Sequence, residues 1–242
     1  MAAVTQAADA KPKLIYFSLR GRGEPLRIAL SAAVGVDGWD IEDVNYPSMK
    51  AGAGTVDFPF GQAPILEHNG VKFAQMDACL RYIGREFDMY GSSNVEQTSI
   101  DMILAGVEDL RVAYTTELCY KHSFSAEAKA NFHASTIASE SSGGRTGGAH
   151  FVYLENILAR SDSFAQTGYA MGGKLSIADI QIFDIMDLVQ RPIMAPDVTP
   201  AILQEKYPNL CAIHARVSSE AGVAAYLASD RRMSKINGNN MG

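Results

Sequence analysis

The sequence lacks the features of several large classes of protein. None of its apolar runs approaches the roughly 20 residues that a membrane-spanning helix needs. It also lacks an excess of positive charge, since 21 Lys and Arg stand against 27 Asp and Glu. The resulting net charge of -6 argues against nucleic acid and anionic membranes as partners. The first ten residues have neither the basic region nor the apolar stretch of a signal peptide.

Cysteine is scarce and scattered. The three cysteines are Cys79, Cys119 and Cys211, an odd number at spacings that fit neither a disulfide framework nor a zinc site. Each is interpreted as a small buried hydrophobic residue. Because this usage fits a reducing compartment, we expect a cytoplasmic protein with no metal. At 242 residues and 47% hydrophobic composition, the chain can bury the core of one large or two small domains.

The first third of the chain alternates between strand-like and helix-like segments. "KLIYFS" predicts a strand, and "GEPLRIALSAAVG" predicts a helix with Pro25 near its start and Gly35 after its end. "WDIEDVNY" predicts a second strand, followed by a glycine-rich loop. "APILEHNGVKFA" predicts a hairpin that turns at Asn69-Gly70, and "DACLRYIGREF" predicts a helix. This order is typical of a small mixed sheet with helices packed on it.

Beyond a polar stretch near residues 88–97, the pattern becomes almost wholly helical. Ser176 and Asp179 form a capping-box pattern before a strongly apolar helix, so we interpret them as structural. The glycine-dense segment 140–148 predicts a loop. We therefore expect α/β plus all-α organisation, with four parts: a flexible tail (1–12), a sheet domain (13–90), a linker (91–97) and an all-helical domain (98–242).

Five strings in family order, spread over about residues 13–229, resemble the cytosolic glutathione transferases. They are "LIYFSLRGRGEPLR", "PFGQAPILE", "LRYIGREF", "IDMILAGVEDLR" and "LSIADIQIFDIMD". The resemblance is to the tyrosine-type, sigma-like members, and more distantly to the pi class. It implies a thioredoxin-like, glutathione-binding N-terminal domain, a helical substrate-binding domain, a homodimer, and glutathione as co-substrate.

Tyr16 occupies the position of the family's catalytic tyrosine. A free thiol has a pKa of about 8.5, so glutathione at neutral pH is mostly protonated and a poor nucleophile. A hydroxyl that donates a hydrogen bond to the sulfur favours the thiolate. Ser18 is the alternative donor, because it shares a strand face with Tyr16 if the strand extends that far. Arg20 and Arg22 either support the electrostatics of the site or are solvated residues of a turn.

The resemblance also implies the residues that bind glutathione. Pro64 matches a proline that is cis in this fold, and the Ala63 backbone would pair with the cysteinyl part of glutathione. Lys50 would counter the glycine carboxylate, while Asp109 would reach the α-amino group of the glutathione on the partner subunit. The full expected set is Arg22, Tyr46, Lys50, Gln62, Ala63, Pro64, Gln75, Met76 and Asp109.

Met76 departs from the family pattern, which has Gln-Ser where this chain has Gln75-Met76. In that pattern both side chains hold the γ-glutamyl carboxylate at a helix N-terminus, where free N–H groups and the dipole favour an anion. Losing the serine hydroxyl removes one hydrogen bond to a charged group. We expect glutathione binding to be weakened about tenfold rather than abolished.

The pocket for the second substrate would draw on Phe17, Arg111, Tyr114 and Cys119, with Arg111 also expected as an ion-pair partner of its acidic neighbours. Phe60 stands where some classes place an aromatic residue at the dimer interface. The leading hypothesis is a detoxifying transferase that conjugates glutathione to small hydrophobic electrophiles. The alternatives are a glutathione-dependent isomerase or peroxidase on the same scaffold, and a weakly active binding or structural protein.

Overall fold

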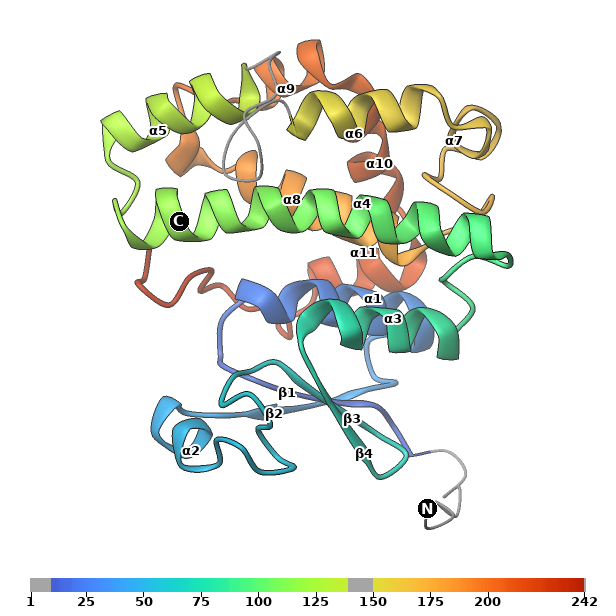
Figure 1. The fold of residues 1–242 in the computed structure, drawn as a ribbon, viewed down its shortest axis with the longest axis vertical. Coiled ribbons are helices and arrows are strands. Elements are labelled where there is room, and N and C mark those ends of the chain that lie inside the picture. Colours follow the sequence, from blue (N-terminus) through green and yellow to red (C-terminus); the bar gives the residue numbers. More distant parts are fainter. Residues whose placement is uncertain (1–9, 139–149, 242) are drawn as a thin grey trace. The chain divides into compact units, whose positions relative to one another are not determined.

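The computed structural model describes residues 10–138 and 150–241, which form two compact units. One unit contains the chain up to Phe87 together with Glu220–Lys235, and the other contains Asp88–Ser219 and Ile236–Gly242. The expected loop at 140–148 and most of the expected tail lie outside the described residues. Figure 1 shows the course of the chain through both units.

The first unit is built on a four-stranded sheet in the order β2-β1-β3-β4. The strands are β1 (Lys13–Tyr16), β2 (Asp40–Asp43), β3 (Ile65–His68) and β4 (Val71–Ala74). β1 runs parallel to β2 and antiparallel to β3, and β3 and β4 form a hairpin. The hairpin turns at Asn69 and Gly70, which both have positive φ, as Asn-Gly turns do.

The longer helices of this unit are α1 (Glu24–Val34), α3 (Met76–Glu86) and α11 (Ala221–Ala228). α1 and α3 lie side by side on one face of the sheet, and α11 packs on α1 (Figure 1). Gly222 allows a close approach there, because an added Cβ would lie 2.1 Å from the Ser31 carbonyl oxygen. Residues 220–235, which were expected in the helical domain, thus belong to the unit that contains the sheet, where α11 packs on α1. No local sequence pattern indicates this long-range contact.

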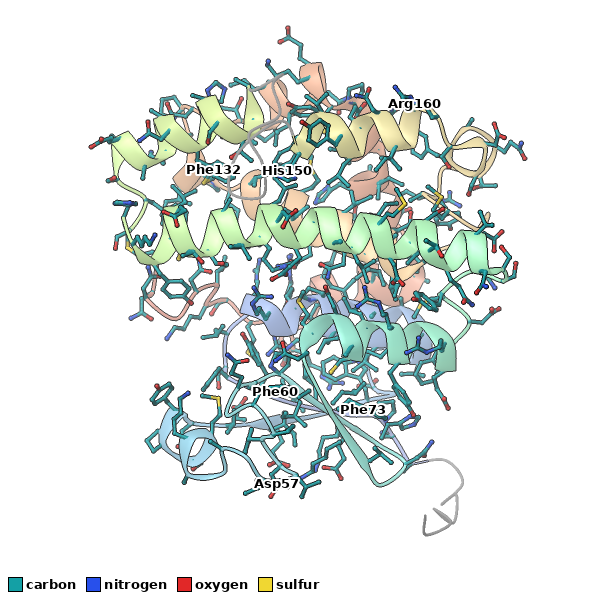
Figure 2. The ribbon with its side chains drawn as sticks, in the orientation of Figure 1. Asp57, Phe60, Phe73, Phe132, His150 and Arg160 are labelled. Carbon is teal, nitrogen blue, oxygen red and sulfur yellow. The ribbon has the colours of Figure 1, made fainter. Side chains whose placement is uncertain are left out.

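The segment after β2 begins with a short helix, where the sequence predicted the end of a strand and a loop. Tyr46–Ala51 forms a short helix, α2, whose first turn contains Pro47 and is capped by the Asn45 side chain accepting from the Ser48 N–H. Beyond α2, Asp57 forms an ion pair with Lys72 on β4, which ties the loop to the edge strand. Asp57 and Phe60 are labelled in Figure 2.

The second unit is helical throughout its described part. Its helices are α4 (Asn94–Val112), α5 (Ala126–Phe132), α6 (His150–Ala159), α7 (Asp162–Thr167), α8 (Ile177–Val189), α9 (Pro200–Lys206) and α10 (Pro208–Ser218). α4 and α5 each continue into a π-helical stretch, Ala113–Tyr120 and His133–Ile137. The most buried helix is α8, which packs against α4 and α10 and forms the centre of this core.

The capping box expected at the start of α8 is confirmed. Asp179 accepts hydrogen bonds from the Ser176 N–H (2.8 Å) and hydroxyl (2.6 Å), and from the Ala170 N–H (2.7 Å). The carboxyl group is fully buried, and burial raises its pKa to about 6 despite these three donors. Ser176 and Asp179 therefore hold the entry to the central helix, which is a structural role.

Candidate active site

The register of the sheet brings the expected glutathione-site segments to one end. Ile15 pairs with Ile65 across β1 and β3, and Ile65 pairs with Ala74 across β3 and β4. The last residue of β1, the residues before β3 and the residues after β4 therefore meet at the same edge. These are Tyr16, the Gln62–Pro64 segment and the Gln75–Met76 pair. α2 follows the neighbouring end of β2, since Tyr16 pairs with Asp43.

Tyr16 is buried, and its hydroxyl group faces the turn that leads into α1. The backbone N–H of Arg22 donates a hydrogen bond of 2.9 Å to the Tyr16 hydroxyl oxygen. A hydroxyl whose oxygen accepts such a bond becomes a better donor of its own proton, because hydrogen bonds in a chain polarise one another. The Phe17 ring meets the Tyr16 ring edge-on, with the centroids 5.4 Å apart.

Two glycines make room for the Tyr16 ring. A Cβ added at Gly23 would lie 2.4 Å from Cδ1 of Tyr16, and one added at Gly21 would lie 2.6 Å from its hydroxyl oxygen. Gly21 also has a φ of +39°, which side chains rarely adopt. The glycines of the "RGRG" string therefore permit the turn to close over the tyrosine.

The loop before β3 brings the expected cis proline and the lysine of α2 together. The Ala63–Pro64 peptide is cis, which confirms the conformation that the resemblance implied. Lys50 donates a hydrogen bond of 3.1 Å from Nζ to the Gly61 carbonyl, and its Nζ lies 5.4 Å from the centroid of the Tyr46 ring. The lysine thus reaches the Gly61–Ala63 segment despite the long loop between them.

Gln75 and Met76 stand at the N-terminus of α3. Gln75 has φ 71° and ψ 118°, an unusual backbone for a non-glycine residue, and its side-chain amide donates to the Gln62 side-chain oxygen at 3.2 Å. Residues held in such regions cluster at functional sites. Met76 is only 3% exposed, so its side chain is part of the core. Among the described residues no side chain caps this helix end, whose first N–H groups have no acceptor within the helix.

The other candidate residues are Ser18 and Phe17 near β1 and Arg111 in the helical unit. Ser18 is exposed and Phe17 is half-buried, both just after β1. Arg111 forms the expected ion pair with an acidic neighbour, Glu108, at 3.9 Å, and it also forms a buried ion pair of 2.7 Å with Asp184. Its guanidinium also donates to the Gln181 side chain at 2.7 Å.

Three of the four expected pocket residues are core residues of the helical unit: Arg111, Tyr114 and Cys119, each at most 1% exposed. Their expected role in the pocket for the second substrate stays a prediction, and the structure shows them packed in the core. Asp109, also on α4, is half-buried.

The cysteines are poor candidates for thiolate chemistry at neutral pH. Burial raises the pKa of Cys79 to about 12 and that of Cys211 to about 11, and it also raises the pKa of Cys119. Within residues 10–138 and 150–241, no group of three or more His, Cys, Asp or Glu side chains is arranged to hold a metal ion. No helix in that part of the chain has the length and apolar character needed to cross a membrane.

The sequence patterns did not reveal a buried charged cluster behind Tyr16. Glu24 and Arg27 on α1 are 2% and 0% exposed and form an ion pair of 3.4 Å. Arg232, in the segment that follows α11, donates to Glu24 at 3.1 Å. Two opposite charges three residues apart within the apolar segment "GEPLRIAL" are a signal for such a pair, whereas nothing local points to Arg232.

The fold and this site define a class of protein: a thioredoxin-like sheet unit with a cis proline before β3, joined to a helical unit. A family model described as "Glutathione S-transferase, C-terminal domain" matches residues 126–230. A glutathione S-transferase of Dirofilaria immitis is 30% identical over 230 residues, covering 94% of this chain and 97% of the relative. Glutathione S-transferase P 1 of Bufo bufo is 30% identical, covering 93% and 96%.

A solved structure agrees with these relatives. The Pi-class glutathione S-transferase of Onchocerca volvulus superposes with a TM-score of 0.74 at 29% identity, covering 96% of this chain and all of that one. The chain belongs to the cytosolic glutathione transferase family, and it is an enzyme of that family. The assignment to the tyrosine-type, sigma-like members stays a prediction, and the Bufo bufo and Onchocerca volvulus proteins carry the names P 1 and Pi-class.

Proposed function

We propose that the protein conjugates glutathione to small hydrophobic electrophiles, and that Tyr16 stabilises the thiolate. In this reaction the thiol proton passes to solvent, and the thiolate sulfur forms a bond to an electrophilic carbon as the leaving group departs. The single observation that carries the proposal is the Arg22 N–H donating to the Tyr16 hydroxyl at 2.9 Å. That bond occupies the hydroxyl oxygen as an acceptor and orients its proton toward another partner.

Glutathione would lie along the edge where the ends of β1, β3 and β4 meet. Its cysteinyl part would pair with the Ala63 backbone as an added strand, and its glycine carboxylate would meet Lys50. Its γ-glutamyl carboxylate would lie at the N-terminus of α3, with Gln75 held beside it by Gln62. Arg22 and Tyr46 complete the proposed set on this unit.

The electrophile is proposed to contact Phe17, whose half-buried ring lies edge-on to Tyr16. No particular electrophile is favoured by these residues. Isomerase and peroxidase reactions use the same thiolate, and a panel of substrates at a fixed glutathione concentration separates them from conjugation.

We also propose a homodimer in the cytoplasm with a role in detoxification. Exposed large apolar side chains support the dimer: Phe60 after α2 is 63% exposed, and Met102 on α4 is 60% exposed. In such a dimer Asp109 would approach the α-amino group of the partner's glutathione. Light scattering on the purified protein measures the mass directly, and Phe60→Ser should favour the monomer.

The proposed reaction is tested by Tyr16→Phe, with Ser18→Ala as the matched control. Removing the hydroxyl should lower kcat/KM for a generic aryl halide by about 10–100-fold, since a charge-assisted hydrogen bond contributes roughly 1.5–3 kcal/mol. Calorimetry should show that both variants still bind glutathione. Full turnover in Tyr16→Phe with loss in Ser18→Ala would assign the role to the serine. An absence of glutathione binding in the unmodified protein would contradict the proposal as a whole.

A further inference from the structure

Arg27 lies behind Tyr16 and binds the backbone of the turn that follows it. Its guanidinium donates to the carbonyl oxygens of Phe17 (3.2 Å), Leu19 (2.9 Å) and Arg20 (3.3 Å). The side chain is completely buried, and its Nε atom has no hydrogen-bond partner. A planar fork of five donors can close a turn in this way, whereas a lysine ammonium cannot match several carbonyls at once.

The same guanidinium is close enough to Tyr16 to influence its hydroxyl. Its central carbon lies 5.6 Å from the centroid of the Tyr16 ring, within the range of a cation–π contact. Because the group is buried, its charge is screened far less than that of an exposed arginine. A fixed positive charge behind the ring favours negative charge in front of the hydroxyl, where a bound thiolate would lie.

Glu24 holds Arg27 from the opposite side. One carboxylate oxygen accepts from Arg27 (3.4 Å) and from the Tyr226 hydroxyl (2.9 Å), and the other accepts from Nε of Arg232 (3.1 Å). Tyr226 is on α11, and Arg232 follows it. A buried carboxylate with three donors is satisfied, and it cannot turn away from Arg27 without leaving charges unpaired.

The segment that follows α11 also binds the turn after β1 directly. We define Ser229–Lys235 as the C-terminal segment. Arg20 donates from Nε to the Met233 carbonyl at 2.7 Å, and its backbone N–H donates to the Lys235 carbonyl at 2.9 Å. Residues 17–20 are therefore held by Arg27 on one side and by the C-terminal segment on the other.

We propose that Arg27 is a positioning residue for Tyr16, and that Glu24, Arg232 and Tyr226 keep it in place. This inference rests on the proposed function, because it assigns a cause to the strength of the Tyr16 hydrogen bond to the thiol. It makes Arg232 and Tyr226 a part of the active-site support, although more than 200 residues separate Glu24 from Arg232 in the sequence.

The experiment titrates bound glutathione by the ultraviolet absorbance of its thiolate, at saturating glutathione and without electrophile. Arg27→Lys keeps the charge and loses the fork, so the midpoint of the titration should rise by about one pH unit, a tenfold change in ionisation. Arg232→Gln and Tyr226→Phe should raise it by less, with KM for glutathione nearly unchanged and kcat at neutral pH reduced.

The matched control is Arg231→Gln in the same C-terminal segment. Arg231 stacks on the Trp39 ring at 4.0 Å and donates to the Trp39 carbonyl at 2.9 Å. Because Trp39 is the only tryptophan in the sequence, its fluorescence should change in this variant and report the loss of the Arg231–Trp39 contact alone. The titration midpoint should stay at the value of the unmodified protein.

A folded Arg27→Lys with an unchanged midpoint would overturn the inference. If Arg27→Lys does not fold, unchanged midpoints in both Arg232→Gln and Tyr226→Phe would overturn it instead. Failure of the proposed function looks different: the unmodified protein would then show the same midpoint as free glutathione. A third outcome separates the two proposals. If Tyr16→Phe abolishes the lowered midpoint but Arg27→Lys, Arg232→Gln and Tyr226→Phe leave it unchanged, the proposed function holds and the role of Arg27 is contradicted.

Discussion

The backbone N–H of Arg22 lies 2.9 Å from the Tyr16 hydroxyl oxygen and donates a hydrogen bond to it. This contact joins the last residue of β1 to the turn before α1. Its geometry depends on the glycines on either side of Arg22, which let the turn approach the aromatic ring. The position of the hydroxyl is therefore set by backbone rather than by a mobile side chain, which is the kind of preorganisation that favours charge stabilisation.

Gly23→Ala should disturb this arrangement by sterics alone. The backbone at Gly23 has a φ of -83°, which alanine adopts without strain, but the new Cβ would lie 2.4 Å from the Tyr16 ring. Overpacking of this kind costs about 1–3 kcal/mol. We expect lower thermal stability and a loss of conjugating activity that is greater than the loss of glutathione affinity.

Gly106→Ala on α4 is the matched control for that substitution. An added Cβ would meet only the Leu154 side chain, at an ordinary distance of 3.5 Å. Alanine is preferred over glycine within a helix by up to about 1 kcal/mol. Melting temperatures and steady-state kinetics of the two variants should diverge, and equal activity in both would contradict the steric account of the turn.

Lys50→Met should weaken glutathione binding about fivefold, because it removes an exposed cation proposed to meet the glycine carboxylate. The remaining affinity should depend less on salt than that of the unmodified protein, since exposed charges are screened. Lys121→Met, which removes a cation paired with Glu117 in the helical unit, is the control. Calorimetric titration at two ionic strengths measures both effects, and identical salt dependence in the two variants would exclude the role of Lys50.

Met76 is buried, so replacing it has two effects that must be separated. Met76→Ser creates a cavity and restores a hydroxyl, whereas Met76→Ala creates nearly the same cavity without one. Both should lose about 2–5 kcal/mol of stability, as buried Met→Ala substitutions do. If a hydroxyl at this position can reach the ligand, the serine variant should bind glutathione about tenfold more tightly than the alanine variant. Equal affinities would show that Gln75 and the helix N-terminus suffice.

Asp179 should make stability depend on pH in a direction unusual for an aspartate. Its pKa of about 6 in the fold lies above its ordinary value of 3.8, so the folded protein binds a proton that the unfolded chain releases. Its contribution therefore increases as the pH falls from 7 towards 4, by at most about 3 kcal/mol.

Asp179→Asn removes this titration. The stability difference between the unmodified protein and the variant, measured by denaturant unfolding, should grow in favour of the unmodified protein between pH 7 and pH 5. The exposed Asp162→Asn should show no comparable trend. A difference that shrinks over the same range would mean that the carboxyl is held ionised.

The sequence was informative where a local pattern decides the structure. The segment "KLIYFS" and the Asn69-Gly70 turn predicted a strand and a hairpin that the structure contains. Ser176 and Asp179 form the predicted capping box because both partners lie within one helical turn. The family resemblance predicted the rest: a thioredoxin-like unit with a cis proline, followed by a helical unit.

What the sequence could not show depends on contacts between distant segments. Besides its neighbour Glu108, Arg111 pairs with Asp184, 73 positions away. Tyr226 and Glu24 meet across 202 positions. No periodicity or short motif encodes such pairs, since each partner alone resembles an ordinary charged or aromatic residue of a helix. The burial of Met76 likewise depends on tertiary packing that no local pattern encodes.

The most direct test of the account is the pH titration of the thiolate of bound glutathione in the unmodified protein and in Tyr16→Phe. We predict a midpoint about two pH units below that of free glutathione in the unmodified protein, which corresponds to roughly 2.7 kcal/mol of stabilisation of the thiolate. In Tyr16→Phe the midpoint should return most of the way to the free value. Equal, lowered midpoints in both proteins would contradict the central claim that Tyr16 stabilises the thiolate.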